Sequence, residues 1–196
     1  MKNTDLKIFI DKYSYKKGED YNLSFLPMLI RRKLRPLSKI AFSSLYECYE
    51  NNDVTLVFAS KYSEFEKLIQ LSKQYKEDNE ISPIAFSTSV HNATVGAFSL
   101  LNKINGSYTS IGASNYSFHA GLLDGILSSQ EKDTLFCYAD YGESFSCLIK
   151  KNSTSSPIKL ELADNEKVNS IAEFEEFLQN KRNEFLGNNY ILKRNI

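Results

Sequence analysis

Residues 82–125 constrain the fold more than any other stretch, because they alternate signals for helix, tight turn, strand, sharp bend and second helix. Pro83 disfavours helix immediately before it. Asn92 is a residue type that caps helices, and apolar residues recur at helical spacing over residues 93–103. The Asn-Gly pair at 105–106 then ends that helix and turns the chain.

Residues 108–113 are β-prone and flanked by small residues, which is typical of a short buried strand. Ser114 and Asn115 follow at the predicted bend, and residues 118–127 form the second helix. A strand that bends sharply into a helix commonly places a nucleophile in enzymes of this layout. The residues at the bend therefore decide which chemistry the chain can carry out.

Apolar patterning places the remaining elements. It predicts strands over residues 6–15, 54–60, 134–140, 144–151 and 158–162, and helices over 29–49, 64–76 and 170–186. Pro36 is expected to kink the first of these helices or to reset its start. The order predicts an α/β fold with a mixed five-stranded sheet and helices on both faces. Its central strands are expected to be 54–60, 108–113 and 134–140, within one domain spanning residues 1–196.

Charge and composition exclude several classes of function. Lysine plus arginine and aspartate plus glutamate each number 24, so no overall field attracts nucleic acid. No apolar run approaches the length of a membrane span, and residues 1–20 lack the apolar core of a signal peptide. These features predict a cytoplasmic protein that binds neither membrane nor nucleic acid.

The cysteines and histidines predict no metal, cofactor or disulfide. Three cysteines are a poor disulfide framework. Cys137 and Cys147 flank a predicted turn, where they are expected to form a reduced pair across a hairpin. The only histidines, His91 and His119, are isolated from any Cys/His spacing that suits zinc.

The central unit also carries a family resemblance. Asn92-Ala93-Thr94-Val95-Gly96 resembles the Ser/Asn-Ala-x-x-Gly helix of β-ketoacyl synthases, which have the thiolase fold. Gly106 is similar to the turn of that family, and residues 108–113 to the strand before its active-site cysteine. The helix that begins near Ser117 resembles the one that follows the cysteine. The resemblance implies one half of a thiolase fold.

A closer resemblance is to the β-ketoacyl synthase-like N-terminal family, in the sequence Phe86-Ser87-Thr88-Ser89-Val90-His91-Asn92-Ala93. Its members are short proteins of aryl polyene type gene clusters, often described as chain-length factors. Residues 26–34, Leu-Pro-Met-Leu-Ile-Arg-Arg-Lys-Leu, resemble the basic helix entry of that family. The resemblance covers about residues 26–141 and implies a role in fatty acid or polyketide biosynthesis.

The chain departs from an active ketosynthase at the bend. Alignment places Asn115, or with one deletion Ser114, where the family has its nucleophilic cysteine. The second thiolase half, which supplies a histidine pair or His-Asn pair and a lysine, has no counterpart here. Condensation needs a covalent acyl carrier and imidazole donors for the developing oxyanion. We therefore expect no condensation by this chain alone, and no catalytic residue of that kind.

Two uses of the bend residues remain open. Ser114 with His91 or His119 as base is the arrangement of a small serine acyl hydrolase or acyltransferase. No complete Gly-x-Ser-x-Gly elbow surrounds Ser114, however. Small polar residues also fit a crowded turn, and both histidines also suit structural hydrogen bonds.

The basic residues Arg31, Arg32, Lys33 and Arg35 form a candidate patch for an acidic acyl carrier protein. They suit equally a solvated helix face with local ion pairs.

The resemblance finally implies an interface. In the resembled fold, the strand over residues 108–113 pairs across the dimer two-fold, and an uncovered edge strand invites aggregation. The expected partner is an active β-ketoacyl synthase in a heterodimer, whose acyl pocket this chain shapes, or a second copy of this chain in a carrier-binding scaffold. The candidate interface residues are Val90, His91, Asn92, Val95, Phe98, Tyr108, Ser110, Ile111 and Ala113.

Overall fold

The computed structural model describes residues 6–19, 22–165 and 167–194. The strands are β1 (Leu6–Lys17), β2 (Thr55–Ala59), β3 (Tyr108–Ile111), β4 (Thr134–Asp140), β5 (Glu143–Lys150), β6 (Ile158–Leu162), β7 (Glu184–Gly187) and β8 (Tyr190–Arg194). The helices are α1 (Met28–Lys33), α2 (Pro36–Cys48), α3 (Phe65–Asp78), α4 (Pro83–Ser87), α5 (Ala93–Leu101), α6 (Ser117–Ser128) and α7 (Ile171–Leu178), with a 3₁₀ turn, η1 (Ser114–Tyr116).

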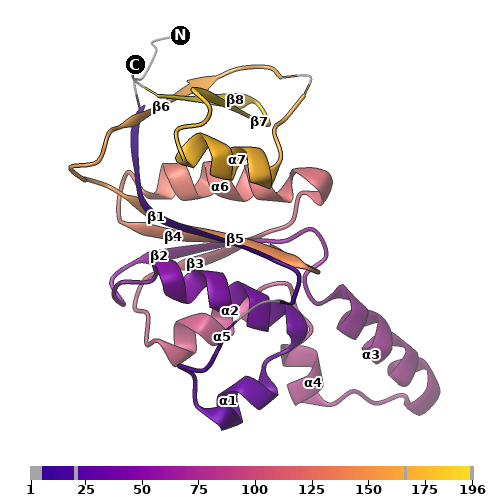
Figure 1. Ribbon diagram of the computed structural model, residues 1–196. Helices are drawn as coiled ribbons and strands as arrows, with labels where there is room; N and C mark the ends of the chain where they lie inside the picture. The colour runs from indigo at the N-terminus through magenta and orange to yellow at the C-terminus, as the bar shows by residue number, and fades with distance from the viewer. Residues whose placement is uncertain (1–5, 20–21, 166, 195–196) are drawn as a thin grey trace.

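All eight strands form one mixed sheet in the order β3-β2-β4-β5-β1-β6-β8-β7. β2 is parallel to both β3 and β4, and the remaining pairs are antiparallel. The long strand β1 pairs with β6 through its first residues and with β5 through the rest, and its register shifts between Ile10 and Lys12. Such a bulge bends a strand. β6, β8 and β7 accordingly lie above the main sheet (Figure 1).

Helices cover both faces of the main sheet. α2 and α5 pack on one face, and α6 packs on the other, where α7 and the β6-β8-β7 strands cover it in turn (Figure 1). Each face has its own buried apolar cluster, one around Phe118, Phe136 and Phe174 and one around Phe42 and Phe98. The C-terminal segment therefore completes the core over α6.

Gly121 allows α6 to approach the sheet closely. A Cβ atom at this position would lie 2.4 Å from the Cβ of Ala59 and 2.8 Å from the Phe136 ring. Both neighbours are fully buried side chains of the central strands. Any larger residue at position 121 would push α6 off the sheet.

The predicted α/β class, mixed sheet and helices on both faces are confirmed, but the predicted number of five strands is wrong. The C-terminal helix ends at Leu178, and the residues after it form β7 and β8. The expectation that residues 108–113 form a buried central strand is also wrong. β3 is an edge strand that pairs with β2 alone among the described strands, and its residues are exposed or half-buried. Pro36 resets the helix start, which divides the helix predicted over residues 29–49 into α1 and α2. Asn92 makes no side-chain capping bond, although it does precede α5.

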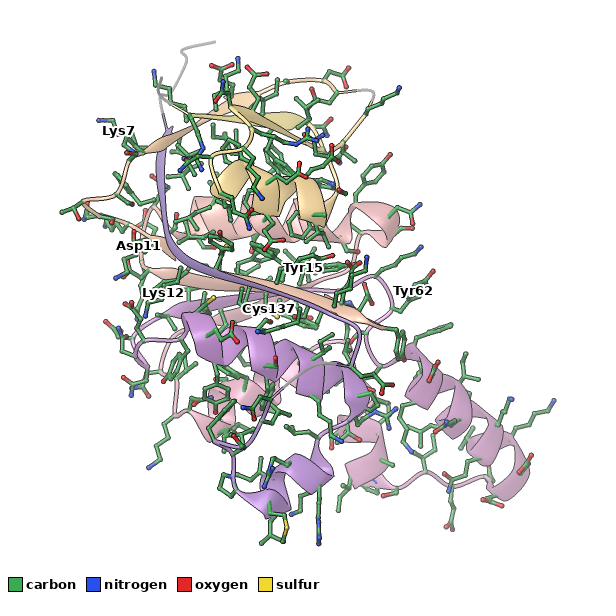
Figure 2. The ribbon with its side chains drawn as sticks, in the orientation of Figure 1. Lys7, Asp11, Lys12, Tyr15, Tyr62 and Cys137 are labelled. Carbon is green, nitrogen blue, oxygen red and sulfur yellow. The ribbon has the colours of Figure 1, made fainter. Side chains whose placement is uncertain are left out.

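The expected pairing of Cys137 with Cys147 is also wrong. In the β4–β5 hairpin Cys147 lies opposite Phe136, and Cys137 lies opposite Ser146. The two thiols belong to the apolar clusters on opposite faces of the sheet. Both thiols are free, and Cys137 lies in the interior between the sheet and α2 (Figure 2).

Among the described residues, no helix is long and apolar enough to cross a membrane, and no group of histidine, cysteine and carboxylate side chains is placed to hold a metal ion.

Candidate functional site

The carboxyl ends of the parallel strands β2, β3 and β4 lie together at one end of the sheet. The residues that follow these strands form the candidate site. Ligands of α/β folds commonly bind beyond the carboxyl ends of parallel strands. The segments that meet here are the loop after β2, the bend after β3 and the last residue of β4. The two candidate residues of the bend, Ser114 and Asn115, lie at this end of the sheet.

Asp140, the last residue of β4, holds the loop after β2. Its carboxylate accepts hydrogen bonds from the Ser60 hydroxyl (2.8 Å), from the backbone N–H of Lys61 (2.7 Å) and from that of Tyr62 (3.0 Å). The side chain is 7% exposed. These bonds fix the direction in which Lys61 leaves the sheet.

The bend after β3 is held by hydroxyl groups. The Ser117 hydroxyl donates to the Ser114 carbonyl (2.7 Å) and accepts from the Ala113 N–H (2.9 Å). Ser114 has a backbone φ of 51°, in the left-handed region that residues other than glycine rarely adopt. Strain of this kind costs on the order of 1 kcal/mol and is common at functional sites.

Asn115 is an exposed residue whose amide is held from the β2 side. Its Oδ1 accepts a 2.6 Å hydrogen bond from Lys61 Nζ. The geometry thus places a neutral, hydrogen-bonded carboxamide at the bend. An amide of this kind is a donor and acceptor but has no nucleophilic atom comparable to a thiolate.

His91 joins the edge strand β3 to the end of β2. Its Nδ1 lies 2.6 Å from Ser110 Oγ, and its Nε2 lies 3.1 Å from the Ser60 carbonyl oxygen. In the neutral ring, Nε2–H donates to the carbonyl and Nδ1 accepts from the serine hydroxyl. A Cβ atom at Gly112 would lie 3.2 Å from Nε2, so the ring fits closely against this backbone.

His119 lies in a different environment, inside the cluster beneath α7. Its ring stacks on Phe185 at 5.7 Å and is 5% exposed. Burial lowers the pKa of His119 to about 4, although the Asn169 backbone accepts a hydrogen bond from the ring. Nδ1 has no partner in the described part of the chain. Neither histidine is hydrogen-bonded to the Ser114 side chain among the described residues.

The thiols lie elsewhere and are protonated at neutral pH. Cys48, Cys137 and Cys147 are all buried. Burial raises the pKa of Cys48 to about 12 and that of Cys137 to about 11, and it raises the pKa of Cys147 well above its usual range. Reactive cysteines need accessible thiolates, which these residues do not provide.

The candidate interface residues divide into two groups. Val95 and Phe98 are on the inner face of α5 and are buried in this chain's own core. Val90, Ser110, Ile111 and Ala113 are half-buried near the edge strand, and His91 is half-buried beside them, while Asn92 and Tyr108 are exposed.

Three exposed apolar side chains on α4 and α5 did not stand out in the sequence. Ile84 and Phe86 on α4 are 78% and 52% exposed, and Leu100 on α5 is 83% exposed. Sequence patterning predicted no helix over residues 83–87 and left Leu100 out of the apolar set of the helix over residues 93–103, so only the fold shows α4 and these outward-pointing side chains.

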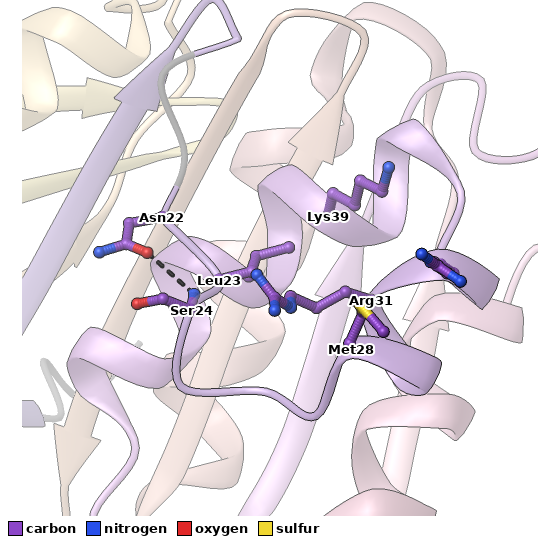
Figure 3. Close-up of a pocket in the computed structure, with 7 residues that line it drawn as sticks. Asn22, Leu23, Ser24, Met28, Arg31 and Lys39 are labelled. Carbon is purple, nitrogen blue, oxygen red and sulfur yellow. Dashed lines mark hydrogen bonds between the residues drawn. The ribbon is translucent and has the colours of Figure 1, made fainter.

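The basic patch is divided between two cavities. Arg31 and Arg32 line a cavity of about 490 Å³ together with Lys39, Met28 and the segment from Asn22 to Ser24 (Figure 3). Arg35 points elsewhere and forms an ion pair with the buried Glu64. Lys33 lines a second cavity beside that ion pair.

Sequence reasoning missed Lys61 and Asp140, which fix the site. Each lies far in sequence from the residue it holds, so only the parallel pairing of β2 with β3 and β4 brings them together. An aspartate at the end of a predicted strand was the one available signal.

Comparisons with known proteins agree with this architecture. The sequence profile described as "Beta-ketoacyl synthase, N-terminal domain" matches residues 11–185. A chain of the ketosynthase (ApeO) in complex with its chain length factor (ApeC) from Xenorhabdus doucetiae superposes with a TM-score of 0.74 at 17% identity, over 95% of this chain and 98% of that chain. The two share the thiolase-like fold.

An HMG-CoA synthase complexed with CoA superposes with a TM-score of 0.44 at 13% identity, over 84% of this chain and 48% of that chain. No curated protein matches the sequence.

Proposed function

The chain belongs to the β-ketoacyl synthase N-terminal domain family, and from this membership we propose that it is a non-catalytic subunit that pairs with an active ketosynthase and shapes its acyl pocket. The whole chain, residues 1–196, acts as one such unit. The observation that carries the proposal is the bend, where Ser114 and an Asn115 amide held by Lys61 stand in place of a cysteine.

The chemistry of the bend supports the non-catalytic part of the proposal. Acyl condensation needs a nucleophile that carries the acyl chain, and in this family that group is a thiolate. The three thiols of this chain are buried in the core, away from the bend. Neither histidine is hydrogen-bonded to Ser114 among the described residues: His91 binds Ser60 and Ser110. His119 lines a cavity together with Asn115, but its ring stacks on Phe185 under α7.

The open edge of β3 supports the pairing part. β3 pairs with β2 on one side only among the described strands, and its first residue, Tyr108, is 43% exposed. Exposed Leu100 adds apolar surface on α5, which packs beside β3, and exposed Ile84 and Phe86 add more on α4. Native proteins rarely leave an edge strand with exposed apolar surface uncovered. We therefore infer that a ketosynthase subunit covers the edge of β3. The similar solved structure is itself described as a ketosynthase bound to its chain length factor.

We further propose that an acyl carrier protein of a fatty acid or polyketide pathway, of the aryl polyene type, docks near Arg31 and Arg32. These two residues and Lys39 surround a cavity, and none of the described residues that line it carries a carboxylate (Figure 3). Acidic carrier surfaces and phosphate groups bind such guanidinium clusters. Arg35 contributes less to this patch than the sequence suggested, because it lies outside the cavity and pairs with Glu64.

Intact-mass measurement tests the non-catalytic role. After incubation with acyl carrier thioesters, we expect no mass increase on this chain alone, because no accessible thiolate exists to accept the acyl group. The Asn115→Cys variant is the matched comparison, since it restores a thiol at the bend. A stable adduct on Ser114 or on a native cysteine would instead favour a serine acyl hydrolase or acyltransferase, for which the left-handed Ser114 is the supporting observation.

A further inference from the structure

A second cavity, of about 470 Å³, lies between the α1–α2 corner and the helices α3, α4 and α5. None of the bend residues lines it. Figure 1 shows these helices on the side of the sheet away from α6 and α7. Volumes of this size are usual for small-molecule sites. The cavity is therefore a candidate binding site separate from the bend.

One wall of the cavity is apolar. It is formed by Leu34, Ile84, Ala85, Ala93 and Ala97. Ala93 and Ala97 are four residues apart on α5, so their small side chains lie on one helix face and leave an open strip. Ile84 is 78% exposed beside this strip. An alkyl chain laid along the wall would cover apolar surface that now faces water.

The same cavity is also lined by positive charge. Lys33, Arg35 and Lys67 line the cavity, whereas Glu64 is its only carboxylate. Lys33 and Lys67 make no ion pair among the described residues. The lining therefore holds two more positive charges than negative ones.

The Arg35–Glu64 pair prepares one of these cations for a ligand. Glu64 is 3% exposed and accepts a hydrogen bond from Nε of Arg35. The terminal nitrogens of the same guanidinium have no hydrogen-bond partner among the described residues. Because the buried carboxylate fixes the side chain by Nε, the remaining N–H groups keep one orientation and can bind an oxyanion in a bidentate manner.

We propose that this cavity binds a single-chain anionic amphiphile, with its carboxylate on Arg35 between Lys33 and Lys67 and its alkyl chain along Ala93 and Ala97. Binding of this ligand requires neither a ketosynthase partner nor a carrier protein. Ile84 also belongs to the apolar surface proposed above for pairing, so the test uses the chain alone, where that surface is open. Each methylene buried on the wall should strengthen binding up to about fourfold.

The test is calorimetric titration of the full chain with decanoate, hexanoate and decanol. We expect decanoate to bind more tightly than hexanoate, which lacks the alkyl contacts, and than decanol, which lacks the charge. Lys67→Gln should weaken decanoate binding about three- to tenfold by removing a neighbouring charge. Ala97→Phe should abolish decanoate binding by filling the strip. Lys73→Gln is the control for Lys67→Gln, because Lys73 is on the same helix, α3, but outside the cavity, and it should leave binding unchanged.

Equal binding of decanol and decanoate would overturn the proposal, because the charged lining would then select nothing. Unchanged decanoate affinity in Ala97→Phe would also overturn it, by placing the ligand elsewhere. Far-UV circular dichroism of each variant establishes that lost binding does not come from lost folding.

Discussion

Folding gives the two histidines opposite roles. Both ring nitrogens of His91 are used, one on a hydroxyl and one on a carbonyl, so the ring acts as a bridge between strands. His119 is instead surrounded by Phe118, Phe185 and the backbone of Asn169, where a positive charge is poorly solvated. From the sequence, both histidines were candidate bases for Ser114. The sequence does not show which residues surround a histidine in the folded chain, so it could not separate these two roles.

His119 should make folding stability depend on pH. Its pKa of about 4 in the native state lies below the ordinary value of 6.5, so the unfolded chain binds the proton first. The stabilisation is present above pH 6.5 and is lost as the pH falls toward 4. Between pH 7 and 4.5 we expect this residue alone to lower the free energy of unfolding by about 2 kcal/mol.

Urea denaturation at the two pH values measures this effect as the difference between the native chain and His119→Gln. Gln keeps a hydrogen-bond donor toward Asn169 but does not titrate in this range. If the variant loses as much stability on acidification as the native chain, His119 is not responsible.

At the scale of elements, apolar periodicity identified most strands and helices but missed the end of the chain. Phe174, Phe177 and Leu178 follow helical spacing, yet Asn180 adopts a φ of 62° just beyond the last turn of α7. The following Gly-Asn-Asn at 187–189 joins β7 to β8 and is a hairpin signal. The hairpin signal was present in the sequence, but the helical spacing of the residues before it led to a predicted helix that extended to residue 186.

Strand order lies beyond local pattern. The segment that became β3 is small and β-prone, which fits a central strand and an edge strand equally. Its place at the edge is decided by tertiary pairing with β2. Of the candidate site, the bend with Ser114 and Asn115 was predictable. The position of Lys61 beside Asn115 depends on the β2–β3 pairing, and that of Asp140 beside Lys61 depends on the β2–β4 pairing.

The start of α7 offers a direct test of one element. The Ser170 hydroxyl accepts from the Glu173 N–H at 3.3 Å, and Glu173 accepts from the Ser170 N–H at 2.7 Å. This reciprocal capping box should contribute about 1 kcal/mol. Ser170→Ala is expected to lower the melting temperature by about 2–4 °C in a chain of this size. Ser170→Asp, which keeps a capping oxygen, should retain most of the stability in the same thermal scan, and an equal loss in both variants would show that the cap is not the cause.

At the scale of the whole molecule, the C-terminal segment buries one face of the sheet within the chain, whereas the edge strand β3 is left open in the described part of the chain. α7 and the β6-β8-β7 strands cover α6 from within the chain, so that face needs no partner to be buried. The β3 edge has no such cover among the described residues. Association is therefore expected at β3, α4 and α5 and not at the α7 face.

Ile111 is an unsuitable position for testing this association, because its side chain packs against the chain's own core. Tyr108 is better placed. Ser107 and Ile111 direct their carbonyls toward β2, and polar groups alternate in direction along a strand. The N–H of Tyr108 therefore points away from β2, toward any added strand.

Tyr108→Pro should abolish strand pairing with a partner while leaving the β2–β3 ladder intact, because the N–H that proline removes is the outward one and the first residue of an edge strand tolerates its fixed φ. Tyr108→Ala is the matched control, since both variants lose the phenol ring and only one loses the N–H. Light scattering of the chain alone, and co-purification with a ketosynthase, should show assembly retained at least in part by Tyr108→Ala and lost by Tyr108→Pro. An obligate interface of this kind buries on the order of 2,000 Å² or more, so its loss should be evident at micromolar concentration. Equal assembly of the two variants would place the interface away from the β3 edge.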